Sequence, residues 1–151
     1  AAPARLRLGA LFVAEMRLEM VALNELLRQS DFISINCDLN PTSYHLINRE
    51  TLSHVKPGAV LINTARGPVV EEAALIEALQ SGLLGGAALD VFEVEPLPLT
   101  SPLLKMDNVL LAAHNSNPSP AAWTRVHKNT IRNLLSGLGI ACDDLDDWMK
   151  V

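Results

Sequence analysis

Arg66, Glu95 and His114 each follow a different apolar segment of the sequence, and their types can act together in acid–base chemistry. The planar guanidinium of an arginine can hold a carboxylate in two parallel hydrogen bonds. An imidazole titrates near neutral pH, so His114 can exchange a proton with a hydroxyl or carbonyl group. Glu95 can orient that imidazole. Position alone also allows a plainer interpretation, in which the arginine is a surface charge, the histidine a turn residue and the glutamate a solvated carboxylate.

The elements that must position these residues alternate between strand and helix. Short apolar runs predict strands at 32–35, 59–63, 87–91 and 109–112. Helical spacing predicts helices at about 21–27, 71–80 and 119–138, with a short helical turn at 51–55. This alternation predicts an α/β fold with a mainly parallel sheet flanked by helices. Ligands of such sheets bind at the carboxyl ends of the strands, where all three candidate residues are expected.

Composition excludes several classes of protein. The chain has 151 residues, of which 49% are hydrophobic and 19% charged, as in one globular domain and unlike a disordered chain. A net charge of −5 argues against a dedicated nucleic-acid binder, and the apolar runs are too short to span a membrane. Two cysteines, Cys37 and Cys142, fit a reducing compartment, so we expect a cytoplasmic protein. No histidines or cysteines have metal-ligand spacing, so we expect no metal site.

Three segments resemble the signature blocks of the D-isomer-specific 2-hydroxyacid dehydrogenases: 63–70, preceded by Lys56-Pro57-Gly58, then 86–96 and 108–114. They occur in the order of that family, which includes phosphoglycerate dehydrogenases, glyoxylate and hydroxypyruvate reductases, formate dehydrogenases and the C-terminal-binding-protein corepressors. The similarity covers about residues 23–139. The resemblance implies an NAD-dependent oxidoreductase, a cytoplasmic dimer, that transfers a hydride between nicotinamide and a 2-oxo or 2-hydroxy acid.

The resemblance also implies a role for individual residues. Arg66 matches the arginine that binds the substrate carboxylate, His114 the catalytic histidine, and Glu95 the acid paired with that histidine. Asp90 matches the carboxylate that bonds the nicotinamide amide. The residues expected to contact NAD are Cys37, Thr64, Ala65, Arg66, Asp90, His114 and Asn117. The remaining histidines, His45, His54 and His127, are predicted to be surface or helix residues without a role.

The sequence departs from the family pattern in several places, two of which concern the cofactor. No glycine-rich G-x-G-x-x-G turn is present, since Gly9 is the only glycine before Gly58. We therefore expect a truncated, partial Rossmann-like domain whose first nucleotide-binding half is missing: an unmatched segment at 1–20, the second half at 21–139 and an acidic tail at 140–151. Asp38 stands where the family usually has proline, and its negative charge favours NAD over NADP.

Three functions stay open from the sequence. The first is the oxidoreductase, with its missing half supplied by a complementing chain or by a homo-oligomer. The second is a non-catalytic interaction module, which would use the sheet edge left by the missing strands. The third is an inactive truncated product. The sequence leaves the identity of the 2-hydroxy acid, the choice between NAD and NADP, and the oligomeric state undetermined.

Overall fold

The computed structural model of the chain describes residues 15–116 and 119–140. Predictions that concern residues 1–14, Asn117, Cys142 and the acidic tail from residue 141 onward therefore lie outside the described residues. The chain divides into two compact units, residues 1–114 and 115–151, and each is considered by itself.

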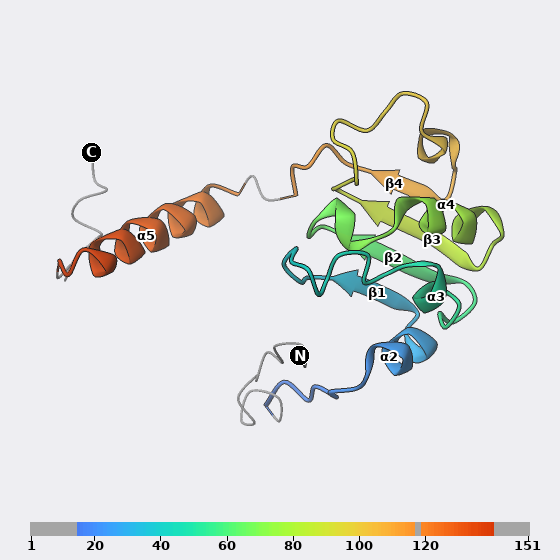
Figure 1. The fold of residues 1–151 in the computed structure, drawn as a ribbon, viewed down its shortest axis with the longest axis horizontal. Helices are drawn as coiled ribbons and strands as arrows, with labels where there is room; N and C mark the ends of the chain where they lie inside the picture. Colours follow the sequence, from blue (N-terminus) through green and yellow to red (C-terminus); the bar gives the residue numbers. More distant parts are fainter. Residues whose placement is uncertain (1–14, 117–118, 141–151) are drawn as a thin grey trace. The chain divides into compact units, whose positions relative to one another are not determined.

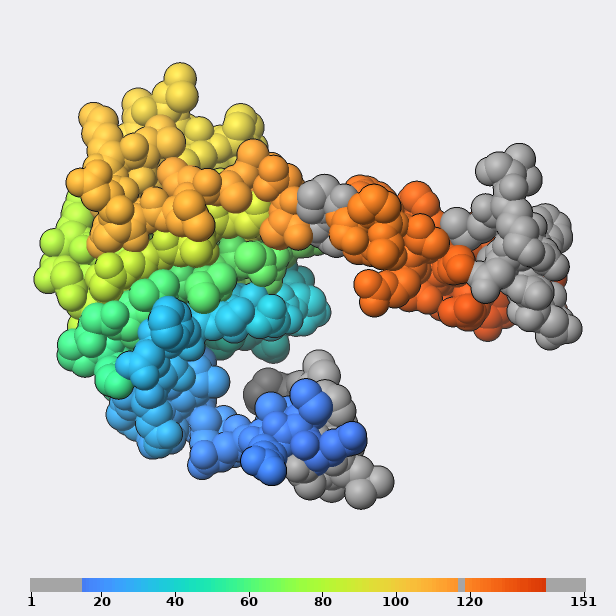
Figure 2. Space-filling model, turned by 180° about the vertical axis from the view of Figure 1, so that it is seen from behind, coloured from blue at the N-terminus to red at the C-terminus, as the bar shows by residue number. Residues whose placement is uncertain are grey.

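The first unit is built on a four-stranded parallel sheet (Figure 1). Its strands are β1 (Phe32–Ile35), β2 (Ala59–Asn63), β3 (Leu84–Leu89) and β4 (Val109–Leu111). They lie in the order β1-β2-β3-β4, and the coloured segments follow that order across the unit in Figure 2. The predicted α/β fold with a parallel, Rossmann-like sheet is confirmed.

The register of the sheet aligns its carboxyl ends. Asn63 at the end of β2 pairs with Ile35 on one side and Leu89 on the other, and Leu89 pairs with Leu111. The four last strand residues therefore form one row. The segments that follow them must leave the sheet at the same edge.

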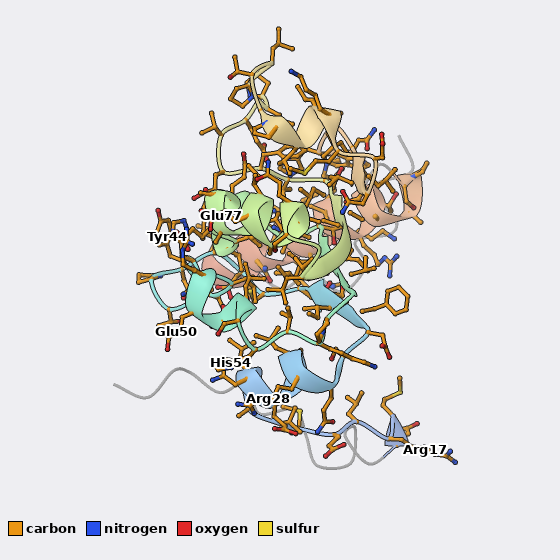
Figure 3. All side chains as sticks on the ribbon, turned by 90° about the vertical axis from the view of Figure 1, so that its right-hand side faces the viewer. Arg17, Arg28, Tyr44, Glu50, His54 and Glu77 are labelled. Atoms are coloured by element: carbon orange, nitrogen blue, oxygen red, sulfur yellow. The ribbon has the colours of Figure 1, made fainter. Side chains whose placement is uncertain are left out.

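Between residues 22 and 114, three α-helices and two 3₁₀-helices accompany this sheet. They are α2 (Leu23–Gln29), α3 (Arg49–Leu52), η1 (Gly67–Val69), α4 (Glu72–Gln80) and η2 (Pro102–Lys105). α4 packs on β3 and on α3, which also contacts α2. Figure 3 shows Glu50 of α3 and Glu77 of α4 on the same side of the molecule, and Arg49 of α3 forms an ion pair with Glu77. The fully buried core side chains are Leu27, Leu52, Leu61, Leu75, Leu84, Leu103 and Val69.

Several elements differ from their predicted ranges by one to three residues, and for two of them the local cause is clear. β3 starts at Leu84, three residues before the predicted start at 87, because Gly85 and Gly86 add no side chains to the apolar run that marks a strand. The turn predicted at 51–55 is instead a helix at 49–52. It begins early because the side chain of Asn48 accepts from the Thr51 backbone N–H, while the Thr51 hydroxyl accepts from the Asn48 N–H.

The second unit contains α5 (Pro120–Gly137), close to its predicted range. The Ser119 hydroxyl caps the helix by accepting from the Ala122 N–H at 3.4 Å, and Pro120 occupies the first helical position. The rings of Trp123 and His127 lie 5.6 Å apart along this helix. No helix in the described part of the chain is long and apolar enough to cross a membrane.

Gly67 lets the segments after β2 and β3 touch through their backbones. A Cβ atom at this position would lie 1.8 Å from the carbonyl oxygen of Phe92, far inside van der Waals contact. Only glycine allows this approach. It holds the segment that carries Arg66 against the segment that carries Glu95.

We expect Gly67→Ala to lower the free energy of unfolding by about 1–3 kcal/mol or more, because the added methyl group must push the two segments apart. Urea unfolding of the 151-residue chain measures this effect. Gly137→Ala is the matched control, since nothing lies within 4 Å of the Cβ that it adds in α5. A Gly67→Ala chain as stable as the control would contradict the close approach.

Candidate active site

The carboxyl edge of the sheet gathers the predicted site residues from four successive segments. Cys37 follows β1, Arg66 follows β2, Asp90 and Glu95 follow β3, and His114 follows β4. These residues are far apart in the sequence. The in-register strands bring the starts of their segments to one edge.

Asn63 organises the segment that follows β2. Its side chain is 1% exposed, its Nδ2 donates to the Arg66 carbonyl at 3.0 Å, and its Oδ1 accepts from the Ala65 N–H at 3.1 Å. Its own carbonyl accepts from the Asp90 N–H at 3.0 Å. A buried amide that satisfies its polar atoms in this way locks the turn before Arg66. The sequence analysis missed this role, although a polar residue at the end of an apolar strand is the signal for it.

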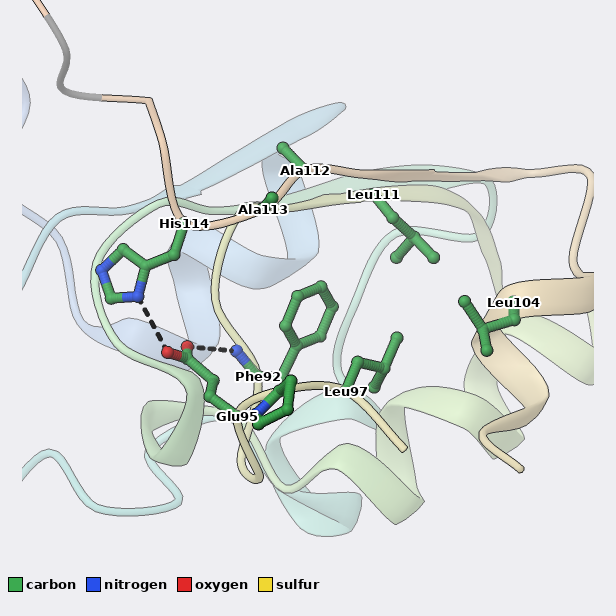
Figure 4. Close-up of a pocket in the computed structure, with 9 residues that line it drawn as sticks. Phe92, Glu95, Leu97, Leu104, Leu111, Ala112, Ala113 and His114 are labelled. Atoms are coloured by element: carbon green, nitrogen blue, oxygen red, sulfur yellow. Dashed lines mark hydrogen bonds and ion pairs between the residues drawn. The ribbon is translucent and has the colours of Figure 1, made fainter. Parts of the chain in front are cut away.

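His114 and Glu95 form the hydrogen-bonded pair that the sequence predicts. His114 Nδ1 lies 2.8 Å from Glu95 Oε2, and Glu95 Oε1 accepts from the Phe92 N–H at 3.0 Å (Figure 4). The side chains of His114 and Glu95 are 50% and 37% exposed, so a ligand can reach the pair. His114 has a left-handed backbone with φ of +53°, which is uncommon for a residue with a side chain.

The pKa of Glu95 lies below its ordinary value of 4.5. The main cause is the hydrogen bond with His114, followed by the bond from the Phe92 N–H. Partial burial opposes this effect, while the charges of His114 and Arg66 add smaller contributions in the same direction. Arg66 therefore lies within electrostatic reach of the pair.

An apolar cavity of about 450 Å³ adjoins the His114–Glu95 pair. It extends between the end of β4 and the proline-containing segment after β3 (Figure 4). Its lining residues are Phe92, Glu95, Pro96, Leu97, Leu104, Leu111, Ala112, Ala113 and His114.

A second cavity, of about 470 Å³, lies at the β1 and β2 ends of the same edge. Its lining residues are Asn36, Cys37, Asp38, Leu39, Thr64, Ala65 and Arg66. It thus brings together four of the residues predicted to contact the cofactor: Cys37, Thr64, Ala65 and Arg66. An amide, a hydroxyl and a guanidinium beside apolar groups are donors and surfaces that a nucleotide can use, so the residues present fit one.

The structure places the remaining predicted residues differently. Asp90 is 4% exposed and does not line either of these cavities. Asn117 lies outside the described residues. His45, predicted to be a surface or helix residue without a role, instead lies in a turn and bonds Glu93. No group of histidine, cysteine and acidic side chains that could hold a metal occurs among residues 15–116 and 119–140.

We expect Glu95 to stabilise the fold more above pH 4.5 than below it. Because its folded-state pKa is lowered, the unfolded chain binds more protons just below pH 4.5, and stability therefore rises with pH there. The contribution is complete above pH 4.5 and is lost as the pH falls through the lowered pKa. Thermal unfolding between pH 3 and 6 should show a weaker acid dependence in Glu95→Gln than in the wild type.

A carbon-13 NMR titration of the Glu95 carboxyl gives a direct check. The midpoint should move toward 4.5 in His114→Ala, which removes the largest cause of the shift but keeps the Phe92 bond. A wild-type midpoint at or above 4.5 would show that the pair does not form in solution.

The chain matches a known protein family over most of its length. The sequence model described as "D-isomer specific 2-hydroxyacid dehydrogenase, NAD binding domain" matches residues 9–116, and the match begins inside the segment left unassigned by the sequence analysis. A glyoxylate reductase of Thermofilum pendens is 50% identical over 121 residues, which are 80% of this chain and 36% of that protein. A glyoxylate reductase of Korarchaeum cryptofilum is 43% identical over 125 residues, or 83% and 38%.

Solved structures show the same relationship. A D-isomer specific 2-hydroxyacid dehydrogenase of Xanthobacter autotrophicus, in complex with NADPH and MES, superposes with a TM-score of 0.68 at 47% identity, over 77% of this chain and 48% of that one. The apo D-mandelate dehydrogenase of Rhodotorula graminis gives a TM-score of 0.77 at 34% identity, over 85% and 37%. The chain thus spans less than half the length of these relatives. It belongs to the D-isomer specific 2-hydroxyacid dehydrogenase family and corresponds to the NAD-binding domain of that family.

Proposed function

We propose that the chain supplies the acid–base residues of an enzyme that interconverts 2-oxo and 2-hydroxy acids with a nicotinamide dinucleotide. The observation that carries this proposal is the 2.8 Å contact between His114 Nδ1 and Glu95 Oε2, at the sheet edge that also holds Arg66. Membership of the family supports the reaction class. The names of the two archaeal relatives make glyoxylate the first substrate to test.

Each residue of the trio has one task in the proposed reaction. Arg66 binds the substrate carboxylate with its guanidinium. One of the five N–H donors of the guanidinium bonds the Ala65 carbonyl, which leaves the others for the substrate. Glu95 holds His114 through Nδ1, so Nε2 is the ring atom that can reach the substrate. Nε2–H donates a proton to the carbonyl oxygen of the 2-oxo acid.

When bound, the reduced nicotinamide supplies the hydride that the carbonyl carbon gains. The 2-oxo acid therefore takes up one hydride and one proton and becomes a 2-hydroxy acid. The reverse reaction returns both. Much of the rate enhancement comes from holding the 2-oxo acid and the His114 imidazole in a fixed geometry.

The order of the strands sets the direction in which a dinucleotide would lie. The substrate carbonyl would lie beside His114 at the β4 end, so residues at that end would hold the nicotinamide half and residues nearer β1 would hold the adenosine half. Three strand spacings separate β1 from β4, or about 14 Å. Cys37, Thr64 and Ala65 would hold the half nearer β1, while Asp90 and Asn117 stay predicted contacts of the nicotinamide half.

Asp38 favours NAD over NADP in this arrangement. Its side chain is exposed, lines the cavity at the β1 end, and has its Oδ2 bonded by Asn40 Nδ2 at 3.1 Å. A carboxylate near the adenosine half repels the additional phosphate of NADP. The predicted cytoplasmic location and dimer stay predictions.

We expect His114→Ala to lower kcat for glyoxylate reduction by at least about 100-fold, because the imidazole supplies the proton. The assay uses the Thermofilum pendens glyoxylate reductase with its aligned segment replaced by this chain. His127→Ala in α5 is the matched control. Retention of kcat within about tenfold in His114→Ala would overturn the assignment.

We expect Asp38→Asn to raise the affinity for NADPH relative to NADH by roughly fivefold, as the loss of one exposed charge contact predicts. Calorimetric titration of the 151-residue chain with each dinucleotide measures the ratio. Asp31→Asn is the control, since it removes the same charge before β1, where Asp31 pairs with Lys56 at 2.6 Å. An equal change of the ratio in both variants would contradict the role of Asp38.

A second candidate function is a non-catalytic interaction module. Among the described residues β1 pairs with β2 only, and its Phe32 is 72% exposed. Such an edge can accept a strand from another chain, which also provides a route to a homo-oligomer or to a complementing chain. The same calorimetric titration separates the two functions, because a module of this kind would bind neither dinucleotide.

A further inference from the structure

Two histidines of the first unit share an unusual backbone and a similar partner. His45 and His114 have φ of +49° and +53°, and Arg17 is the only other non-glycine residue with positive φ among those described. Each histidine pairs with a glutamate of the same turn, Glu93 and Glu95 respectively. Strained backbone of this kind persists only where the surrounding contacts hold it, and it concentrates at functional sites.

His45 is held from four sides. Its backbone N–H donates to the Pro68 carbonyl at 2.9 Å, and its own carbonyl accepts from Asn48 Nδ2 at 2.9 Å. Its ring stacks on Tyr44 with centroids 4.0 Å apart, and its Nε2 lies 2.5 Å from Glu93 Oε1. Tyr44 lies at the outer side of the molecule near α3 (Figure 3).

Glu93 joins the turn after β3 to the start of α4. Its Oε2 accepts from the Glu72 N–H at 2.9 Å, and its own N–H donates to Glu72 Oε2 at 3.3 Å. With the bond from His45, this one carboxylate of the segment after β3 contacts the segments that follow β1 and β2.

The loop that lines the second cavity leads directly to His45. Ser43 is 5% exposed, and its hydroxyl donates to the Asp38 carbonyl at 2.6 Å and accepts from the Asn40 N–H at 2.9 Å. This bonding makes the cavity wall and His45 parts of one closed loop. On the other side of the bridge, Glu95 closes the turn after β3 through the Phe92 N–H.

We propose that His45 and Glu93 are positioning residues, which fasten the wall of the dinucleotide cavity to the turn that aims Glu95 at His114. This inference rests on the proposed function. Side-chain bonds join Ser43 to Asp38, His45 to Glu93, and Glu95 to His114. The backbone at Tyr44 links Ser43 to His45, and the backbone at Val94 links Glu93 to Glu95, so the loop after β1 is connected to the acid–base pair. Neither residue touches the reacting atoms.

The test replaces one end of the bridge with little effect on the backbone. Asparagine tolerates positive φ but is too short to reach Glu93, so His45→Asn removes the bridge and keeps the turn. Glu93→Ala also removes the bond to α4. His54→Asn, in the turn after α3, is the control. In both test variants the carbon-13 titration midpoint of Glu95 should rise toward 4.5, and amide signals of residues 36–39 should shift.

A second measurement uses the hybrid glyoxylate reductase. Because the Glu95–His114 pair is misplaced but still present in His45→Asn, we expect kcat to fall about 10- to 100-fold. The KM for glyoxylate should stay within about twofold. Thermal unfolding verifies that the variant folds. A purely structural role would lower the unfolding temperature without moving the Glu95 midpoint.

The outcomes separate this inference from the proposed function. An unchanged Glu95 midpoint in folded His45→Asn and Glu93→Ala would overturn the positioning role, whatever the hybrid enzyme does. A moved midpoint supports that role even where the wild-type chain binds no NADH, a result that would overturn the proposed function alone.

Discussion

The absence of a side chain at Gly67, where its backbone faces the Phe92 carbonyl oxygen, allows the segments after β2 and β3 to touch. The positions of the segments that carry Arg66, Glu93 and Glu95 depend on that contact. It sets Arg66 within electrostatic reach of Glu95, and it places Glu93 where it can bond the start of α4. Asn63 supports the same contact, because its buried side-chain amide hydrogen-bonds the turn that leads into Gly67.

The edge combines an apolar interior with a small number of paired polar groups. The core beneath it is made of leucine, isoleucine, valine and alanine side chains with a single phenylalanine, and the buried Asn63 lies at the last position of β2. None of the described buried side-chain oxygen or nitrogen atoms lacks a hydrogen-bond partner. Pairing of this kind gives a site a defined geometry without burying an uncompensated charge.

The two cavities at the carboxyl edge differ in the polarity of their lining residues. The cavity at β1 and β2 is polar on one wall and contains the only arginine among its lining residues, Arg66. The cavity beside His114 is almost entirely apolar. The order of the strands places the two cavities at successive positions along the edge, the first at the β1 and β2 ends and the second at the β4 end.

The sequence by itself determined the alternation of strands and helices, the family and the identity of the His114–Glu95 pair. Apolar periodicity is a local property, and three motifs in the right order are specific. The sequence did not reveal the earlier start of β3, where Gly85 and Gly86 interrupt the apolar run, or the hydrogen bonds of Asn63 and His45. The bond of His45 joins residues 48 positions apart, and no local pattern encodes such a contact. Only the tertiary structure decided it, because the register of the sheet and the approach at Gly67 determine which loops meet.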